Sequence, residues 1–323
     1  MAGANTNHRP TVITPGQHLR GIALTAPWLV WLLIADILLS LMLPLKFLFP
    51  DTVYNISSCI AESVWAWIQH IFETKNGAII TFSGDLPPSG ESAIVLANHV
   101  GWSDFYMIQA LAQRAGMLGR CRWFAKVQLR VVPFLGWGLW AMGMPMVSRN
   151  WVKDRVELER VFRGIVERRW PTWLISFSEA TRFTPKKYLE SRKWCVANNR
   201  PQPLHLLYPR TKGFITTVQH LRKGAPQVKA VYDLTIAYQR GAEWQAAPTM
   251  WETLCVSGLS RSQRKNPATG SGKGCRFHVH ARRFPIEELP QTDEGLAQWL
   301  EQRWVEKGEW LDEKRVEWAA AED

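Results

Sequence analysis

The sequence predicts an α/β fold, a mixed sheet flanked by helices, with an N-terminal membrane-anchoring helix or helical hairpin. Three observations predict it. Short apolar runs at residues 92–97 and 172–177 have the length and composition of buried strands. Residues 103–116 and 151–169 repeat apolar side chains at helical spacing. Ahead of them lies an apolar stretch of membrane-spanning length, residues 21–50.

Composition narrows the class of partner. The 39 Lys and Arg residues exceed the 28 Asp and Glu residues, and the net charge of +11 suits an anionic partner: nucleic acid, anionic lipid or a phosphorylated substrate. The 18 tryptophans are typical of a protein that meets a bilayer interface, with core packing as the alternative for most individual positions. No CxxC spacing occurs, so we expect neither a disulfide framework nor a zinc site. The five cysteines, expected to be free thiols, are Cys59, Cys121, Cys195, Cys255 and Cys275.

The N-terminal region is expected to attach the chain to a membrane. Residues 1–20 are polar and are predicted to be disordered. The apolar stretch 21–50 is interrupted by Asp36 and Lys46. Because a carboxylate is costly at bilayer depth, an interfacial helix is the alternative to a spanning one. Residues 56–72 form a second, amphipathic helix, so the two can make a hairpin.

The centre of the chain alternates predicted strands and helices. Residues 78–83 and 92–97 read as strands joined by a turn-rich segment. Residues 131–147 carry no charge, but their glycines and prolines make a poor straight helix. We therefore expect this segment to form a buried or interfacial wall, of the kind that could line an acyl-chain channel, with plain core as the alternative.

The second half continues the pattern. After the helix at 151–169 and the strand at 172–177, residues 186–203 are predicted to be a basic, polar loop. A short helix at 213–222 and a strand at 228–238 follow.

The C-terminal quarter begins with a predicted mobile loop at residues 257–274. The strand at 276–284 places His278 and His280 on one face, which we expect to be exposed rather than metal-binding, because no third ligand lies nearby. Residues 293–320 form the last helix. The predicted organisation is a disordered N-terminus (1–20), membrane-anchoring helices (21–75), an α/β domain (76–290) and a C-terminal amphipathic helix (291–323).

Two polar clusters, at residues 98–104 and 178–182, follow predicted strands, at the carboxyl ends where open α/β sheets keep their sites. In the first, His99 lies on a strand-to-helix turn and Asp104 in the first turn of the helix, with Ser103 placed to cap it. The helix dipole favours an ionised Asp104, which can accept a hydrogen bond from one imidazole nitrogen and leave the other as a base. The alternative is a capped helix beside a structural histidine.

Three polar segments follow one another along the chain: Asn98-His99-x4-Asp104, residues 143–149 (GMPMVSR) and residues 177–182 (FSEATR). In this order they resemble the first three sequence blocks of the glycerolipid acyltransferases, the 1-acylglycerol-3-phosphate acyltransferase family. The resemblance covers most of the chain beyond about residue 75. Ala180 stands where the family's third block usually has glycine. Further matching segments are Lys126, residues 133–137 (PFLGW), 209–214 (PRTKGF), 231–236 (VYDLTI) and Trp299-Leu300.

The resemblance implies a direct acyl transfer. His99 would deprotonate the free hydroxyl of a lysophospholipid as it attacks an acyl-CoA thioester, and Asp104 would orient the imidazole. Backbone amides of residues 101–103 would be candidate donors to the oxyanion. The implied substrate-binding residues are Lys126, Arg149 and Arg182 for the phosphate, Glu179 to orient Arg182 or a glycerol hydroxyl, and Thr181 for a hydroxyl contact.

The resemblance also implies acyl-CoA as co-substrate, no cofactor and no metal, and a protein integral to or tightly attached to a bilayer. The endoplasmic reticulum is the expected compartment if the source is eukaryotic. The expected acceptor is 1-acyl-sn-glycerol-3-phosphate, giving phosphatidic acid, with lysophosphatidylinositol or lysocardiolipin as rivals. A non-catalytic anionic-lipid-binding membrane protein is the alternative from another class. The membrane segment and the absence of a recognisable module oppose a nucleic-acid binder. The sequence does not predict the oligomeric state.

Overall fold

A mixed sheet forms the centre of the molecule, as the sequence predicts. The computed structural model describes residues 13–132, 135–148, 151–261 and 274–321. Within them the strand order is β1-β9-β7-β2-β6-β3, with β8 paired to β7. Neighbouring strands are parallel except for β9 and β8 against β7. The strands are β1 (Ile80–Gly84), β2 (Ser92–Ala97), β3 (Cys121–Trp123), β6 (Trp173–Phe177), β7 (Val228–Arg240), β8 (Glu243–Trp244) and β9 (Cys275–Pro285).

The sheet topology separates two strands that are close in sequence. β1 pairs with β9, whereas β2 lies between β7 and β6. The turn-rich segment between β1 and β2 therefore crosses the sheet instead of closing a hairpin. This arrangement puts β2 at the middle of the sheet, where all six of its residues are buried.

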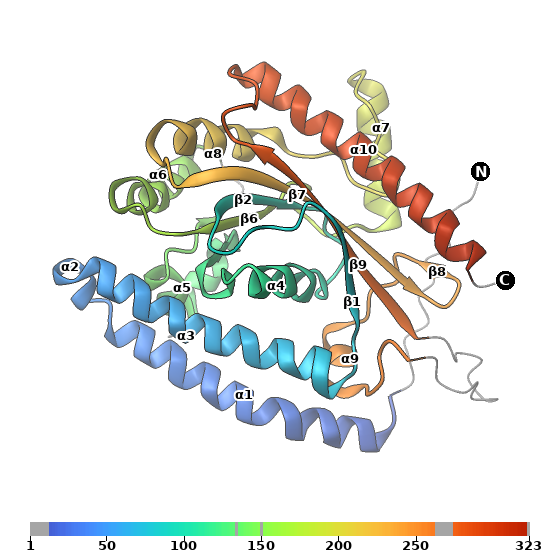
Figure 1. Cartoon of the computed structure of the whole chain (residues 1–323), viewed down its shortest axis with the longest axis horizontal. Helices are drawn as coiled ribbons and strands as arrows, with labels where there is room; N and C mark the ends of the chain where they lie inside the picture. The colour runs from blue at the N-terminus through green and yellow to red at the C-terminus, as the bar shows by residue number, and fades with distance from the viewer. Residues whose placement is uncertain (1–12, 133–134, 149–150, 262–273, 322–323) are drawn as a thin grey trace.

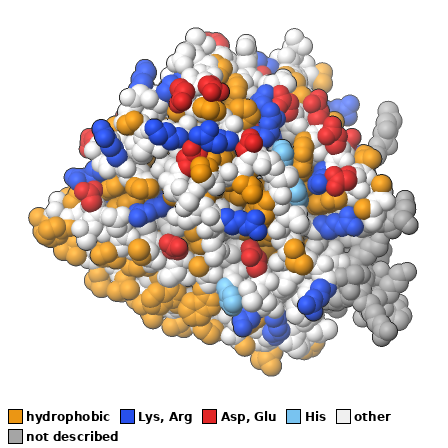
Figure 2. All heavy atoms as spheres, viewed as in Figure 1, with side chains coloured by type: hydrophobic (Ala, Val, Ile, Leu, Met, Phe, Trp, Pro, Cys, Tyr) orange, Lys and Arg blue, Asp and Glu red, His pale blue; other side chains and the backbone are white. Residues whose placement is uncertain are grey.

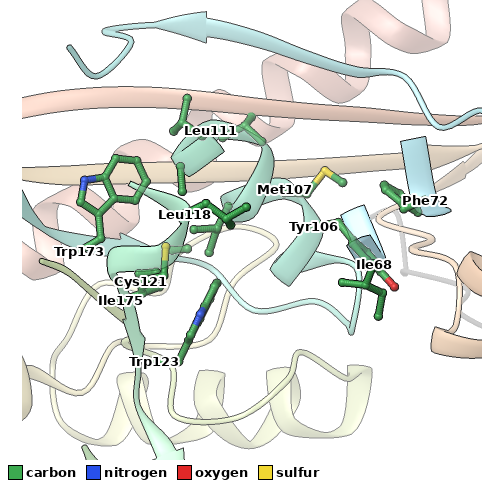
Figure 3. Packing of buried hydrophobic residues seen from close by; sticks show 14 of the residues in the cluster. Ile68, Phe72, Tyr106, Met107, Leu111, Leu118, Cys121, Trp123, Trp173 and Ile175 are labelled. Carbon is green, nitrogen blue, oxygen red and sulfur yellow. The ribbon is translucent and has the colours of Figure 1, made fainter. Parts of the chain in front are cut away.

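Helices cover both faces of the sheet (Figure 1). α4 (Asp104–Arg114) and α3 (Pro50–His70) cover one face, and α6 (Trp151–Arg168), α8 (Thr211–Gly224) and α10 (Asp293–Ala320) cover the other. Each face has its own apolar core, and Figure 3 shows the core beneath α4. There the rings of Phe72 and Tyr106 stack with centroids 4.3 Å apart. The short elements are η1 (Ile71–Lys75), η2 (Leu118–Arg120) and α9 (Met250–Cys255).

The first helix, α1 (Pro15–Leu41), begins earlier than predicted, because Thr14 and Gln17 form a capping box ahead of the apolar stretch. It is the one helix in the described ranges that is long and apolar enough to cross a membrane, with 28% of its most apolar window buried. α1 lies beside α3 (Figure 1), where the Trp28 indole donates to the Val64 carbonyl and the Trp31 indole to Ser63.

After α1, the chain turns through α2 (Leu45–Leu48) into α3, so the predicted helical hairpin forms. The outward face of this hairpin is apolar. Figure 2 shows hydrophobic side chains gathered along the edge that α1, α2 and α3 form. Its exposed members include Leu19, Ile22, Leu29, Val30, Leu33, Leu41, Phe47, Leu48 and Phe49.

The uncharged segment at residues 131–147 is divided among short elements rather than forming a span. η3 (Val127–Val131) precedes α5 (Leu135–Ala141), which packs on α1, and β5 (Met146–Val147) pairs with β4 (Ala125–Lys126) in a second sheet. Val131 is exposed while Met142 and Met144 are buried, so the segment is partly surface and partly core.

Two local predictions are wrong. Residues 186–203 are not all loop, because α7 (Pro185–Ala197) occupies most of that segment. Thr184 caps α7 and Pro185 begins it, but charges on all sides hide the helical period. The face of β9 that carries His278 and His280 is covered by α10, and the Trp310 ring stacks on His280 at 4.8 Å. Among the described residues no group of three or more ligands could hold a metal.

Other predictions hold or fall outside the described residues. α6, α8, β7, β9 and α10 occupy the segments predicted for them, and the five cysteines are free. Residues 262–273, most of the predicted mobile loop, and residues 1–12 of the predicted disordered N-terminus lie outside the described ranges.

The packing of α10 can be tested at Gly308. A Cβ there would lie 2.6 Å from the Leu204 nitrogen and 2.7 Å from its oxygen. Because backbone cannot yield as a flexible side chain can, we expect Gly308→Ala to lower the free energy of unfolding by about 1–3 kcal/mol. The matched control is Gly213→Ala in α8, where a Cβ meets nothing within 4 Å and should stabilise by about 0.5–1 kcal/mol. Equal unfolding midpoints for both variants would contradict this packing.

Candidate active site

The predicted contact between His99 and Asp104 is present. His99 Nδ1 lies 2.7 Å from Asp104 Oδ2, with the imidazole side chain 14% exposed and the carboxylate fully buried. β2 ends at Ala97 and α4 begins at Asp104, so the turn between them brings the two side chains together. With Nδ1–H donating to the carboxylate, Nε2 is the nitrogen left to act as a base.

Asp104 receives more hydrogen bonds than the sequence predicts. Its Oδ2 also accepts from the backbone amides of Val100 at 2.7 Å and Gly101 at 3.0 Å. Its Oδ1 accepts from the Tyr238 hydroxyl at 2.6 Å. Charge-assisted hydrogen bonds of this kind replace the contacts with water that a buried carboxylate loses.

These bonds correct two predictions about the turn. The Gly101 amide donates to Asp104, so it is not a donor to a substrate oxyanion. Ser103 does not cap α4 through its side chain, because its hydroxyl donates to the Pro248 carbonyl at 3.0 Å. The Asp104 carboxylate accepts instead from the amides of the turn that precedes the helix, those of Val100 and Gly101, and so closes the turn rather than capping α4.

Asn98 and Phe177 fix the turn from two sides. The Asn98 side chain exchanges two hydrogen bonds with the backbone of Ile236 in β7, at 2.8 and 3.0 Å. The His99 ring stacks on Phe177, at the end of β6, with centroids 4.1 Å apart, and the Phe183 amide donates to the His99 carbonyl. Residues 177–183 therefore lie against the turn, as parallel strands with adjacent carboxyl ends predict.

Thr181 and Arg182 lie on the outer side of this segment. Thr181 Oγ1 accepts from the Lys187 ammonium at 2.6 Å, and the Arg182 carbonyl accepts from the same group at 3.2 Å. The Arg182 side chain is exposed. Sequence reasoning missed Lys187 because it lies in the segment predicted to be a loop. Ala180 has φ of +56°, so the left-handed conformation that glycine favours is retained at a cost of about 1 kcal/mol.

Glu179 lies on the inner side, 3% exposed. Burial raises its pKa to about 8, offset in part by the Trp304 indole of α10 and by the backbone amides of His99 and Leu207. The Glu179 carboxyl is therefore mostly protonated at neutral pH. Both residues are described, yet no ion pair joins Glu179 to Arg182, and Glu179 lies on the buried side of the turn that carries His99 and Asp104.

Of the two remaining predicted cationic residues, Lys126 and Arg149, the structure describes only Lys126. Lys126 is exposed on β4, opposite Val147 of β5. This pairing brings the segment of Lys126 beside the second sequence block. Arg149, which follows in that block, lies outside the described residues.

Comparison with known proteins identifies the family that the sequence blocks resemble. The family model described as "Acyltransferase" matches residues 79–239, and the model described as "Acyltransferase C-terminus" matches residues 271–313. The chain belongs to the glycerolipid acyltransferase family. The first model begins just ahead of β1 and ends near the end of β7, so it includes the whole turn that carries His99 and Asp104.

Named relatives come from plants and animals. The chain is 29% identical over 266 residues to 1-acyl-sn-glycerol-3-phosphate acyltransferase 2 of Arabidopsis thaliana, covering 81% of this chain and 63% of that protein. It is 31% identical over 272 residues to 1-acyl-sn-glycerol-3-phosphate acyltransferase delta of Homo sapiens, covering 83% and 65%. The chain thus spans somewhat less than two thirds of these relatives. The crystal structure of the acyltransferase PlsC from Thermotoga maritima aligns with 86% of this chain and 97% of that one, at 16% identity and a TM-score of 0.43.

The buried Glu179 predicts a pH effect on stability. A carboxyl with a pKa near 8 in the folded chain and an ordinary value of 4.5 when unfolded keeps a proton that the unfolded chain releases. Wild-type stability should therefore fall as pH rises from about 4.5 to 8. Glutamine cannot ionise, so Glu179→Gln removes this loss. The unfolding free energy of the variant, relative to that of wild type, should therefore rise by about 2–4 kcal/mol between pH 5 and pH 8.

Thermal unfolding at several pH values measures the difference. Glu190→Gln, on the exposed surface of α7, is the matched control and should follow the wild-type curve. Parallel curves for Glu179→Gln and wild type would show that Glu179 is ionised in the folded protein at neutral pH.

Proposed function

We propose that this chain is a membrane-bound, acyl-CoA-dependent O-acyltransferase that acylates 1-acyl-sn-glycerol-3-phosphate and so produces phosphatidic acid. The observation that carries the proposal is the His99–Asp104 hydrogen bond, whose carboxylate is oriented by three further hydrogen bonds. The names of the relatives support the choice of acceptor.

The geometry supports direct transfer of the acyl group from coenzyme A to the acceptor, through a tetrahedral intermediate. His99 Nε2 takes the proton of the acceptor hydroxyl while that oxygen bonds to the thioester carbonyl carbon. The carbon–sulfur bond then breaks, and the imidazolium returns the proton to the coenzyme A sulfur. Asp104 holds the imidazole with Nε2 outward and stabilises its cationic form. The chemistry needs no acyl-enzyme and no cofactor.

The acceptor phosphate would bind on the outer side of the site. Arg182 is the principal candidate, because it follows the segment that stacks on His99 and its guanidinium can bind a phosphate with two hydrogen bonds. Lys187 holds Thr181 and the Arg182 carbonyl and adds positive charge there. Lys126 and Arg149 complete the proposed set.

The apolar edge of the α1–α3 hairpin is the proposed membrane-binding surface. α1 is fixed along the domain at both ends of its length, by Arg20 donating to Asn76 and by its contacts with α5. Beyond α1, Phe47 is 85% exposed at the turn of the hairpin. This arrangement favours a helix lying in the membrane interface over a helix that leaves the domain to span the bilayer. In a eukaryotic cell, we propose the endoplasmic reticulum as the compartment.

Substitution of His99 tests the proposed mechanism. We expect His99→Ala to lower acyl transfer by at least about a thousand-fold, since the base is removed, while binding to vesicles containing lysophosphatidic acid stays near wild type. The assay uses purified protein with radiolabelled acyl-CoA and a panel of lysolipids.

His70→Ala, on the exposed side of α3, is the matched control and should retain activity. Turnover by His99→Ala within tenfold of wild type would eliminate the mechanism. A wild-type protein that binds anionic lipid and acylates no lysolipid in the panel would favour the non-catalytic alternative.

A further inference from the structure

Tyr238 contacts the catalytic pair from the strand beside it. Its hydroxyl donates to Asp104 Oδ1, whereas His99 and the two turn amides bind Oδ2. We infer that Tyr238 is a positioning residue for acyl transfer, one that fixes the rotation of the Asp104 carboxylate and sets how much negative charge faces the imidazole. The inference rests on the proposed function and adds a residue to its machinery.

The sheet register explains how a residue so far along the chain reaches the pair. β7 pairs with β2 up to Ala97 opposite Leu234, and then continues past the end of β2. Asn98 fixes the start of the turn at Ile236. Side chains alternate along a strand, so Tyr238 points to the same face as Ile236, toward α4. That face carries Asp104.

The tyrosine is held in place and remains a donor. Tyr238 is fully buried, and its ring meets Phe277 of β9 edge-on at 6.0 Å. Burial and the charge of Asp104 raise the pKa of Tyr238 well above its ordinary value of 10. The hydroxyl therefore keeps its proton throughout the working pH range.

Loss of this hydroxyl would change the charge that faces His99. A donor to Oδ1 draws negative charge away from Oδ2, and its removal leaves a buried carboxylate oxygen without that partner. More charge would then face the imidazole and stabilise its protonated form. The carboxylate would also be freer to rotate. The first effect changes the pH dependence of catalysis, and the second lowers kcat.

Other ionisable groups near this contact lie after β6 and on α4, β7 and α9. Glu179, after β6, interacts electrostatically with Asp104 and is mostly protonated at neutral pH because burial raises its pKa. Tyr106 of α4 directs its hydroxyl to Thr253 of α9. Further along β7, Arg240 pairs with Glu252 of α9. None of these groups is altered by a change of Tyr238 to phenylalanine.

Tyr238→Phe tests the inference, because it removes only the hydroxyl. We expect the acid limb of the kcat/KM profile to move to higher pH by about 0.5–1 unit and kcat to fall by about 3- to 30-fold. Tyr232→Phe is the matched control. Tyr232 is buried on the same face of the same strand and donates to the carboxylate of Glu91, away from the catalytic pair. Its profile should coincide with that of wild type.

A second variant, expected to shift the acid limb in the opposite direction, distinguishes the proposed effect from a folding defect. Replacing Tyr238 with 3-fluorotyrosine keeps the ring and hydroxyl and strengthens the donor, so the acid limb should move to lower pH. An acid limb that stays fixed in both Tyr238 variants, with wild type active, would overturn the inference.

A readout that does not need turnover separates this inference from the proposed function. The rate at which His99 reacts with diethyl pyrocarbonate, followed by peptide mass spectrometry, rises with pH as the imidazole loses its proton. We expect this rise to occur at higher pH in Tyr238→Phe. A wild type that transfers no acyl group would refute the proposed function while this reaction still tests the contact. Coincident reactivity curves for Tyr238→Phe and wild type would refute the contact.

Discussion

One buried carboxylate governs the arrangement of the site. Asp104 has no exposure to solvent, so its charge must be balanced by hydrogen bonds from the protein. The donors come from the turn, from His99 and from β7, and together they leave the carboxylate little freedom. Removing the partners one at a time would cost far more than each bond contributes, because an ionised group would be left buried without them.

The strand order of the sheet brings the hydrogen-bond partners of Asp104 together. β2 lies at the centre, with β6 on one side and β7 on the other, and both neighbours are parallel to it. The carboxyl ends of the three strands therefore meet at one edge. β6 contributes Phe177 and the segment that follows it, and β7 contributes Ile236 and Tyr238. α10 closes the opposite side of the sheet and reaches the site through Trp304, beside Glu179.

The fold class, most helices and strands, and the contact between His99 and Asp104 could be predicted from the sequence, because each has a local sequence pattern. His99 and Asp104 lie five positions apart, across a strand-to-helix turn that an apolar run followed by helical periodicity predicts. The position of Tyr238 depends instead on the strand order β7-β2-β6, for which residues 228–238 contain no signal. α7 was missed because its apolar residues lack a helical stripe, and Lys187 was missed with it. The inner position of Glu179 depends on α10, more than a hundred residues later in the chain.

The central claim is that Asp104 makes His99 an effective base by fixing its tautomer and stabilising its cation. Single-turnover acyl transfer by Asp104→Asn measures this most directly, because asparagine keeps the shape of the side chain and changes only its charge and its hydrogen bonding. We predict a loss of about a thousand-fold or more in the transfer rate, with the fold intact by circular dichroism. A rate within tenfold of wild type would contradict it.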